Sequence, residues 1–218
     1  MKALIKRVIS LYLGLFLYAV GIVLTLQANI GYGSWEVFHS GLAIVFNSKV
    51  GTMSIWVGLS VGFIVFIFGE KIGLGTISNM IFIGIFMNLL MDSNFFPLIK
   101  NPTLSIVQLI VGLFIIAIAT YYYISSGFGA GPRDSLMVLL ARKGKFSVGF
   151  WRTIIEIVVT IAGAFMGGMF GWGTILTAVL IGFILEVTFK FFKFDPRNVV
   201  HEDIGTSLKK LSFNRGIK

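Results

Sequence analysis

The sequence predicts an all-α membrane protein made of two repeats, each with three transmembrane helices and one short helix that opens with glycines. Three observations lead to this fold class. Hydrophobic residues make up 56% of the 218-residue chain and charged residues only 12%, whereas a soluble domain is about 45–50% apolar. Six apolar runs are long enough to cross a bilayer. The two halves of the chain also align with each other without a gap.

The six predicted spans follow from runs of apolar residues close to the length that a bilayer requires, about 17–25 residues. The first run, at 21 residues, is longer than the apolar core of a signal peptide, about 7–15 residues, so we predict a permanent span there. The spans are expected at residues 8–28, 51–68, 74–91, 104–124, 147–166 and 174–192.

An internal duplication relates the two halves by a shift of 98 positions. Residues 14–92 match residues 112–190 at 18 of 79 positions, and many of the identities are glycines. Such duplications are common in transporter folds. The predicted organisation is a basic N-terminal segment at 1–7, a first membrane repeat at 8–92, a connecting loop at 93–103, a second membrane repeat at 104–192 and a basic cytoplasmic tail at 193–218.

The orientation of the repeats depends on two shorter segments, residues 34–47 and 132–142. If each segment enters and leaves the membrane on one side, a repeat has three spans and the second copy is inverted. If both segments cross, the protein has eight spans and parallel repeats. Helices of about 11–14 residues cover only about 16–21 Å of a hydrocarbon core of about 30 Å, which favours six spans and inverted repeats.

The formal net charge of +9 comes from basic residues near the ends of spans. They form no continuous face, so the charge does not indicate nucleic-acid binding. Lys and Arg at such positions are retained on the cytoplasmic side, which predicts that both termini and the basic loop at 142–145 are cytoplasmic. The chain has no cysteine, so disulfides and thiolate metal sites are excluded.

Two equivalent glycine motifs are the most informative candidate site. Each has the pattern Gly-x-Gly, ends a long span and opens a short helix with an acid in its first turn. Glycines allow the chain to turn at a depth where irregular backbone must face protein or water. Two half-helix N-termini could meet there and line a solute site, or the motifs could be tight turns with capping acids. The candidate substrate-binding residues are Gly31, Gly33, Trp35, Glu36 and His39, with Gly129, Gly131, Pro132, Arg133 and Asp134 in the second copy.

Two further candidates lie in the fifth predicted span. Arg152 and Glu156 are four residues apart and therefore share one helix face. An ionisable group inside a membrane must be paired, protonated or exposed to water, and such groups often mark transport pathways. We expect both residues to belong to one charged cluster with Arg133 and Asp134. The alternative is a structural salt bridge that holds two helices together.

Other polar residues carry weaker predictions. Glu186 is equivalent to Asn88 under the 98-residue shift, and both are expected to form interhelical hydrogen bonds. His39 has no acidic residue or second histidine at ligand spacing, so no metal site is predicted. No nucleotide-binding, metalloprotease or nucleophile motif occurs. We therefore expect no enzymatic activity and no cofactor.

These residues resemble a known family. The run from Ala28 to Gly41, the Gly-Pro-Arg-Asp stretch at 131–134, the Arg-x-x-x-Glu at 152–156 and the two Gly-x-Gly-Thr turns are similar to the YitT/YczE family of bacterial membrane proteins. Glu36 stands where that family's pattern has Asp. The resemblance implies a multi-pass protein of the bacterial inner membrane and names neither a substrate nor catalytic residues.

Together these features predict a transporter or permease of an unidentified small solute. The alternative is a non-transporting regulatory or scaffold protein of the membrane, with a membrane or cytoplasmic protein as its partner. The expected partners are the lipid bilayer and a small solute, and no nucleic acid. Polar residues that converge on one cavity would favour transport, and the same residues scattered over separate helix pairs would favour the alternative.

Overall fold

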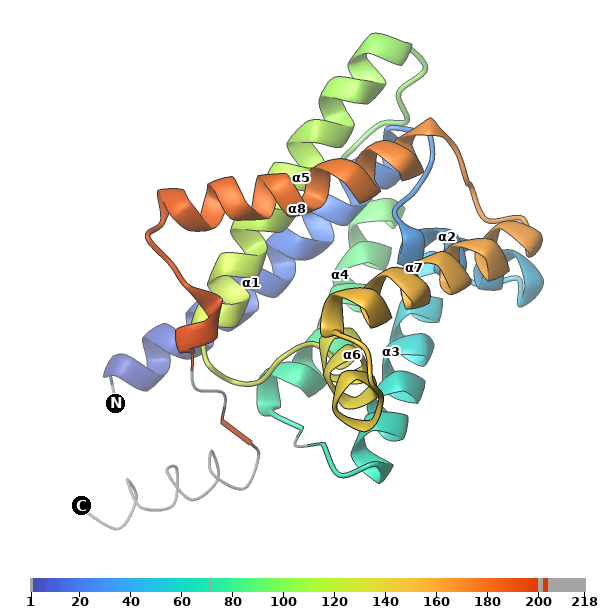
Figure 1. Ribbon diagram of the computed structural model, residues 1–218. Helices are drawn as coiled ribbons and strands as arrows, with labels where there is room; N and C mark the ends of the chain where they lie inside the picture. The colour runs from blue at the N-terminus through green and yellow to red at the C-terminus, as the bar shows by residue number, and fades with distance from the viewer. Residues whose placement is uncertain (1, 71, 200–201, 204–218) are drawn as a thin grey trace.

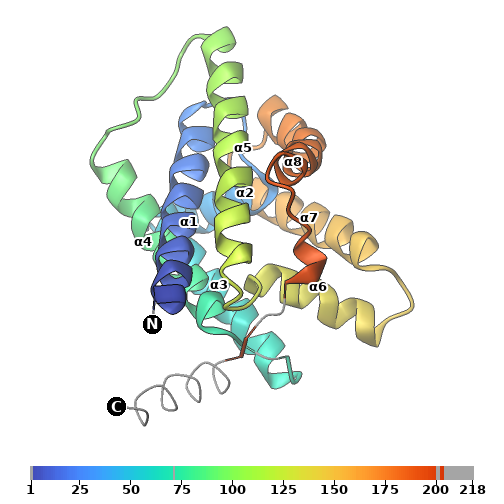
Figure 2. The ribbon, with the colours of Figure 1, turned by 90° about the vertical axis from the view of Figure 1, so that its left-hand side faces the viewer.

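A computed structural model of the chain describes residues 2–70, 72–199 and 202–203. Within these residues the fold is all α, with eight α-helices and a short 3-10 helix at Pro196–Asn198. Figures 1 and 2 show the helices in two perpendicular views. Most of the predicted C-terminal tail lies outside the described residues.

Six helices are long and apolar enough to cross a membrane. They coincide with the six predicted spans, and their ends differ from the predicted ends by at most six residues. Local signals fix some of these ends: the side chain of Asn101 caps the fourth long helix, and that of Ser147 caps the fifth. The long helices are α1 (Lys2–Gln27), α3 (Val50–Ile67), α4 (Leu74–Asp92), α5 (Pro102–Ser125), α7 (Val148–Phe165) and α8 (Trp172–Phe191).

Large apolar side chains cover the outer faces of these helices. Phe165 is 89% exposed, and Trp172 and Phe191 are each 80% exposed. In α7 only 11% of the most apolar stretch is buried inside the protein. A soluble monomer rarely exposes contiguous apolar surface on this scale, whereas lipid tails are a suitable surrounding for it. The exposed faces are therefore those expected of helices embedded in a bilayer.

The two remaining helices, α2 (Ser34–Val45) and α6 (Pro132–Lys143), contain 12 residues each. At 1.5 Å per residue each is about 18 Å long, too short to cross a hydrocarbon core of about 30 Å. Pro132 occupies the first turn of α6, where its missing N–H costs no hydrogen bond. The residues that precede the two helices, Gly33 and Gly131, are the N-caps and make no side-chain cap.

Helices α1 and α5 lie side by side and run in opposite directions (Figures 1 and 2). Glycines allow the close approach. A Cβ on Gly14, early in α1, would lie 2.7 Å from the backbone nitrogen of Tyr123, late in α5. A Cβ on Gly21 would lie 2.8 Å from the carbonyl oxygen of Gly112, nearer the start of α5. Small residues permit such packing between helices in membranes.

Two equivalent hydrogen bonds brace the turns that precede the short helices. The N–H of Gly173, at the start of α8, donates to the carbonyl of Ile30 before α2, at 2.7 Å. The N–H of Gly75, at the start of α4, donates to the carbonyl of Phe128 before α6, also at 2.7 Å. Each bond links the last long helix of one half of the chain to the glycine turn of the other half. The two halves are therefore joined by a reciprocal exchange of contacts.

The same turns have matching backbone conformations. Gly31 has a φ of +119° and Gly129 a φ of +118°, values that side chains with a Cβ rarely adopt. Space is also restricted, because a Cβ on Gly31 would lie 2.8 Å from the backbone of Gly171. The first glycine of each Gly-x-Gly motif, Gly31 or Gly129, is thus required both by its torsions and by the close approach of another backbone.

Candidate functional site

A cavity of about 190 Å³ lies where the eight helices meet. Each helix contributes to its lining, and the lining includes the first turns of both short helices. Nine of the residues predicted for the site line this cavity. They are Gly33, Trp35, Glu36, Gly131, Pro132, Arg133, Asp134, Arg152 and Glu156.

Three predicted site residues do not line the cavity. Gly31 and Gly129 lie in the braced turns, where they pack against the starts of α8 and α4. His39 is fully buried on α2 and contacts Arg133, which itself lines the cavity. The first two residues shape the backbone that carries the site, and His39 supports a residue that faces the cavity.

The lining has an internal symmetry in sequence. Of its 26 residues, 22 form eleven pairs whose numbers differ by 98. Each pair takes one residue from each half of the chain. The pairs are 18 and 116, 22 and 120, 33 and 131, 34 and 132, 35 and 133, 36 and 134, 54 and 152, 58 and 156, 79 and 177, 80 and 178, and 83 and 181.

Arg133 is the residue at the centre of the polar contacts. Its guanidinium lies 4.4 Å from the ring centroid of Trp35 and 3.8 Å from a carboxylate oxygen of Glu36. One Nη atom lies 3.5 Å from Nε2 of His39. A planar guanidinium can stack on an aromatic face and still donate hydrogen bonds at its edge. Arg133, on α6, is therefore held by three side chains of α2.

His39 contacts Arg133 from a fully buried position. Since a guanidinium can only donate, Nε2 of His39 must be the acceptor and the ring proton must sit on Nδ1. Nδ1 has no hydrogen-bond partner among the described residues. A neutral imidazole in this tautomer is consistent with a neighbouring positive charge. His39 thus helps to orient Arg133 without lining the cavity itself.

Arg152 and Glu156 form a second ion pair on the cavity wall. The Nε atom of Arg152 lies 3.0 Å from a carboxylate oxygen of Glu156, as predicted from their spacing on one helix. The pair is more exposed than the Arg133–Glu36 pair, since 48% of the Arg152 side chain and 29% of the Glu156 side chain are accessible. Arg133, predicted to cluster with this pair, lines the same cavity and also contacts side chains of α2.

Sequence reasoning missed several polar residues that face the cavity. Only 4% of Tyr123 is exposed, and its hydroxyl has no hydrogen-bond partner among the described residues. The Oγ1 atom of Thr177 is likewise buried without such a partner. Tyr18 completes this group. All three lie inside apolar runs, where the only available signal was that Thr177 is equivalent to Asn79, a polar residue inside a predicted span that also lines the cavity.

The arrangement can hold a small polar solute. Two helix N-termini, each the positive end of a helix dipole, line one cavity together with two arginines and three carboxylates. Unpartnered hydroxyls at Tyr123 and Thr177 add donors and acceptors. Charges of both signs along one cavity suit a solute that carries polar groups of both kinds.

Comparisons with known proteins agree with the sequence motifs. The family described as a family of unknown function, DUF6198, matches residues 5–190. The chain is 37% identical to the uncharacterized membrane protein YczE of Bacillus subtilis over 188 residues, which cover 85% of this chain and 86% of that protein. It is 29% identical to an uncharacterized protein of Haemophilus influenzae, covering 83% of this chain and 82% of that protein.

A third relative, the uncharacterized protein YyaS of Bacillus subtilis, is 28% identical over 80% of this chain and 88% of its own length. No solved structure matches the chain. The relatives therefore identify a group of proteins and assign no activity to it.

Proposed function

We propose that this chain, which belongs to the DUF6198 family and is a membrane protein, carries a small polar solute across the bacterial plasma membrane. The similarity to YczE confirms the family resemblance of its motifs. The observation that supports transport is the convergence of charged side chains from both halves of the chain on one cavity. A regulatory scaffold needs no such cavity, whereas a transporter binds its solute in one.

We propose further that the two halves are inverted repeats. Support comes from the opposite directions of α1 and α5 (Figure 2) and from the equivalent bonds that brace the two glycine turns. Equivalent residues that touch each other must lie close to a symmetry axis. Trp35 and Arg133 are 98 positions apart and stack on each other. The axis would therefore pass through the cavity, as it does in transporters built from inverted repeats.

The proposed orientation places both termini and the loop at 142–145 in the cytoplasm, because together they carry most of the basic residues. Single cysteines at Lys145 and Lys210 should then be protected from a membrane-impermeant thiol reagent in intact cells. Lys210 lies outside the described residues, and the prediction rests on charge alone. Cells opened by detergent provide the control for reactivity. Labelling of both cysteines in intact cells would reverse the proposed orientation.

Transport is tested with proteoliposomes that contain the purified protein. Vesicles incubated with a deproteinised bacterial extract are washed, and mass spectrometry identifies the compounds they have taken up. We expect at least one small polar compound to accumulate over protein-free vesicles. Vesicles that carry the Arg133→Ala variant serve as the matched control. If no compound accumulates with an ion gradient across the vesicle membrane in either direction, the scaffold alternative is favoured.

The ion pair on α7 gives a further expected result. Glu156→Gln should reduce uptake of the compound by about tenfold or more, the effect of losing about 1.4 kcal/mol of binding or barrier lowering. The membrane abundance of the Glu156→Gln variant should stay near that of the unmodified protein, because Gln keeps the shape of Glu. Arg152→Ala should also reduce uptake, with a small loss of stability, since exposed pairs contribute about 0.2–1 kcal/mol. Additive effects in the double variant would show that the two side chains act independently.

A further inference from the structure

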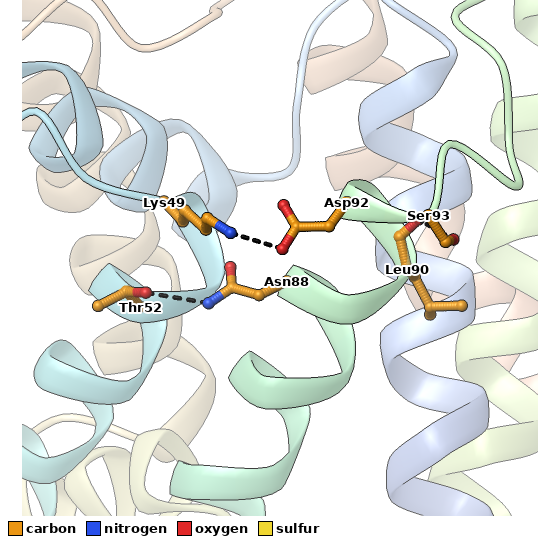
Figure 3. Close-up of polar contacts among 6 residues, drawn as sticks. All are labelled: Lys49, Thr52, Asn88, Leu90, Asp92 and Ser93. Atoms are coloured by element: carbon orange, nitrogen blue, oxygen red, sulfur yellow. Dashed lines mark hydrogen bonds and ion pairs between the residues drawn. The ribbon is translucent and has the colours of Figure 1, made fainter.

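The first half of the chain contains a close packing of α3 on α4, which we call the α3–α4 clasp. Gly51 and Gly84 meet so closely that a Cβ on either would clash with the carbonyl oxygen of the other. Next to them the side-chain amide of Asn88 donates to Oγ1 of Thr52 at 2.9 Å, which confirms the interhelical bond predicted for Asn88. An ion pair between Lys49 and Asp92 closes the end of the clasp (Figure 3).

The equivalent positions of the second half are not in contact. Gly149 and Gly182 are the same residue type as Gly51 and Gly84. A Cβ on Gly182 would meet no atom within 4 Å, and one on Gly149 would meet only the hydroxyl of Ser147, at 3.9 Å. Both glycines therefore lack the packing that explains their counterparts. This half of the structure is open where the first half is closed.

Glu186 shows the same difference. Its counterpart Asn88 bonds across the clasp, but Glu186 pairs with Lys190 on its own helix, at 2.7 Å. The structure therefore shows no interhelical bond of Glu186 to any residue that it describes, unlike the prediction. The position that would face Glu186 across a closed α7–α8 contact is Phe150, the counterpart of Thr52. Residues 150 and 186 would thus meet if α7 and α8 packed as α3 and α4 do, and they do not meet in this conformation.

Side-chain sizes indicate that α7 and α8 are nevertheless complementary. In the clasp, a Cβ on Gly58 would lie 3.4 Å from Met80, so a small residue on α3 faces a large one on α4. The equivalent residues are Glu156 on α7 and Ala178 on α8, and both line the cavity. In a closed α7–α8 contact, a large residue on α7 would therefore face a small one on α8. The total size is preserved although the two sides have exchanged roles.

We propose that α7 and α8 close against each other in a second state of the protein, with Gly149 on Gly182, while the α3–α4 clasp opens. This inference rests on the proposed function, because exchange of open and closed halves would turn the cavity from one side of the membrane to the other. Small residues drive helix association in lipid, and equivalent glycines provide the same surface in each half. Glu156, on the closing helix, would come to lie against Ala178.

Cysteine cross-linking tests the exchange, because the chain contains no cysteine. Two pairs are compared in native membranes: Thr52→Cys with Asn88→Cys across the clasp, and Phe150→Cys with Glu186→Cys across the proposed contact. A short bifunctional thiol reagent joins neighbouring pairs, and a polymeric maleimide then counts the remaining free thiols on a gel. We expect the clasp pair to react quickly and the second pair to react more slowly.

The matched control pair is Phe150→Cys with Val187→Cys. One step along a helix turns a side chain by about 100°. Residue 187 therefore lies at nearly the same depth in the membrane as residue 186, but its side chain points away from the proposed contact with residue 150. The pair at 150 and 186 should react at least several times faster than the control pair. Equal rates for the two pairs would overturn the inference. A variant with all four cysteines, at positions 52, 88, 150 and 186, tests whether the two contacts exclude each other. Cross-linking of both pairs in the same molecule would overturn the proposed exchange.

Gly182→Leu provides the sharpest variant. Since no atom lies within 4 Å of its Cβ position, the leucine should leave abundance and thermal stability unchanged and should abolish cross-linking between 150 and 186. Opening the clasp with Lys49→Ala and Asn88→Leu should raise that cross-linking about fivefold, the ratio produced by roughly 1 kcal/mol. Persistence of the cross-link in Gly182→Leu would refute the contact. None of these readouts requires a solute, so they stand even if the protein transports nothing.

Discussion

Replacing Gly31 with alanine should lower the melting temperature of the purified protein by about 5–20 °C, at about 2–4 °C per kcal/mol for a chain of this size. Two costs add up at this position. A residue with a Cβ is strained at a φ of +119°, and its Cβ would press on the backbone of Gly171 at 2.8 Å. Strain and overpacking of this kind cost about 2–6 kcal/mol together. Fluorescence-detected size exclusion after heating measures the shift.

Gly69→Ala is the matched control for Gly31→Ala. Gly69 also has a positive φ, +84°, but a Cβ there would meet no atom within 4 Å. The alanine at 69 therefore carries the strain without the clash, and should lower the melting temperature by only a few degrees. If both variants lost the same stability, the close approach of Gly31 to the backbone of Gly171 would contribute nothing to the loss.

The spans could be predicted from the sequence because their lengths are set by the bilayer. A run of apolar residues has to be about 20 residues long to cross the hydrocarbon core, whatever it packs against. The short helices were also predictable, since Pro132 suits the first turn of a helix and each short helix follows a Gly-x-Gly motif. Helix ends were less accurate: the first span was predicted from residue 8, whereas α1 begins at Lys2.

The partners of the charged residues were harder to predict. The Arg152–Glu156 pair follows from spacing on a single helix, and the structure contains it. The Arg133–Glu36 pair joins two helices nearly 100 residues apart in sequence, and depends on how one half of the chain sits against the other. No local pattern contains that information. The alignment of the two halves did offer a clue, because Trp35 and Arg133 are equivalent positions under the 98-residue shift.

The difference between the clasp and the open α7–α8 pair could not be read from the sequence at all. Gly51 with Gly84, and Gly149 with Gly182, are the same residues at the same spacing. A symmetric sequence feature predicts a symmetric structure, whereas only one of the two contacts is formed. Which of two such equivalent contacts forms depends on packing over the whole fold, and alternative packings can differ by only a few kcal/mol.

Arg133→Ala should have the largest effect on transport, with a loss of uptake beyond that of any variant of the α7 pair. The substitution removes the stack on Trp35 and leaves Glu36 without the cation beside it. Only 14% of the Glu36 side chain is exposed, so water compensates its charge less well than that of Glu156. A buried polar group left without its partner costs about 1–3 kcal/mol, and more when it is charged. Melting temperature and uptake are measured together for each variant.

A double-mutant cycle separates the two roles of Arg133. In Arg133→Ala with Glu36→Gln no carboxylate is stranded, so stability should recover most of what the single Arg133→Ala variant loses, while uptake stays low because the guanidinium is still missing. Arg133→Lys keeps the charge but not the planar fork that stacks and donates at the same time; it should retain stability better than uptake. Full uptake by Arg133→Lys would reduce the role of Arg133 to a simple positive charge. Recovery of uptake in the double variant would show that Arg133 only neutralises Glu36 and does not contact the solute.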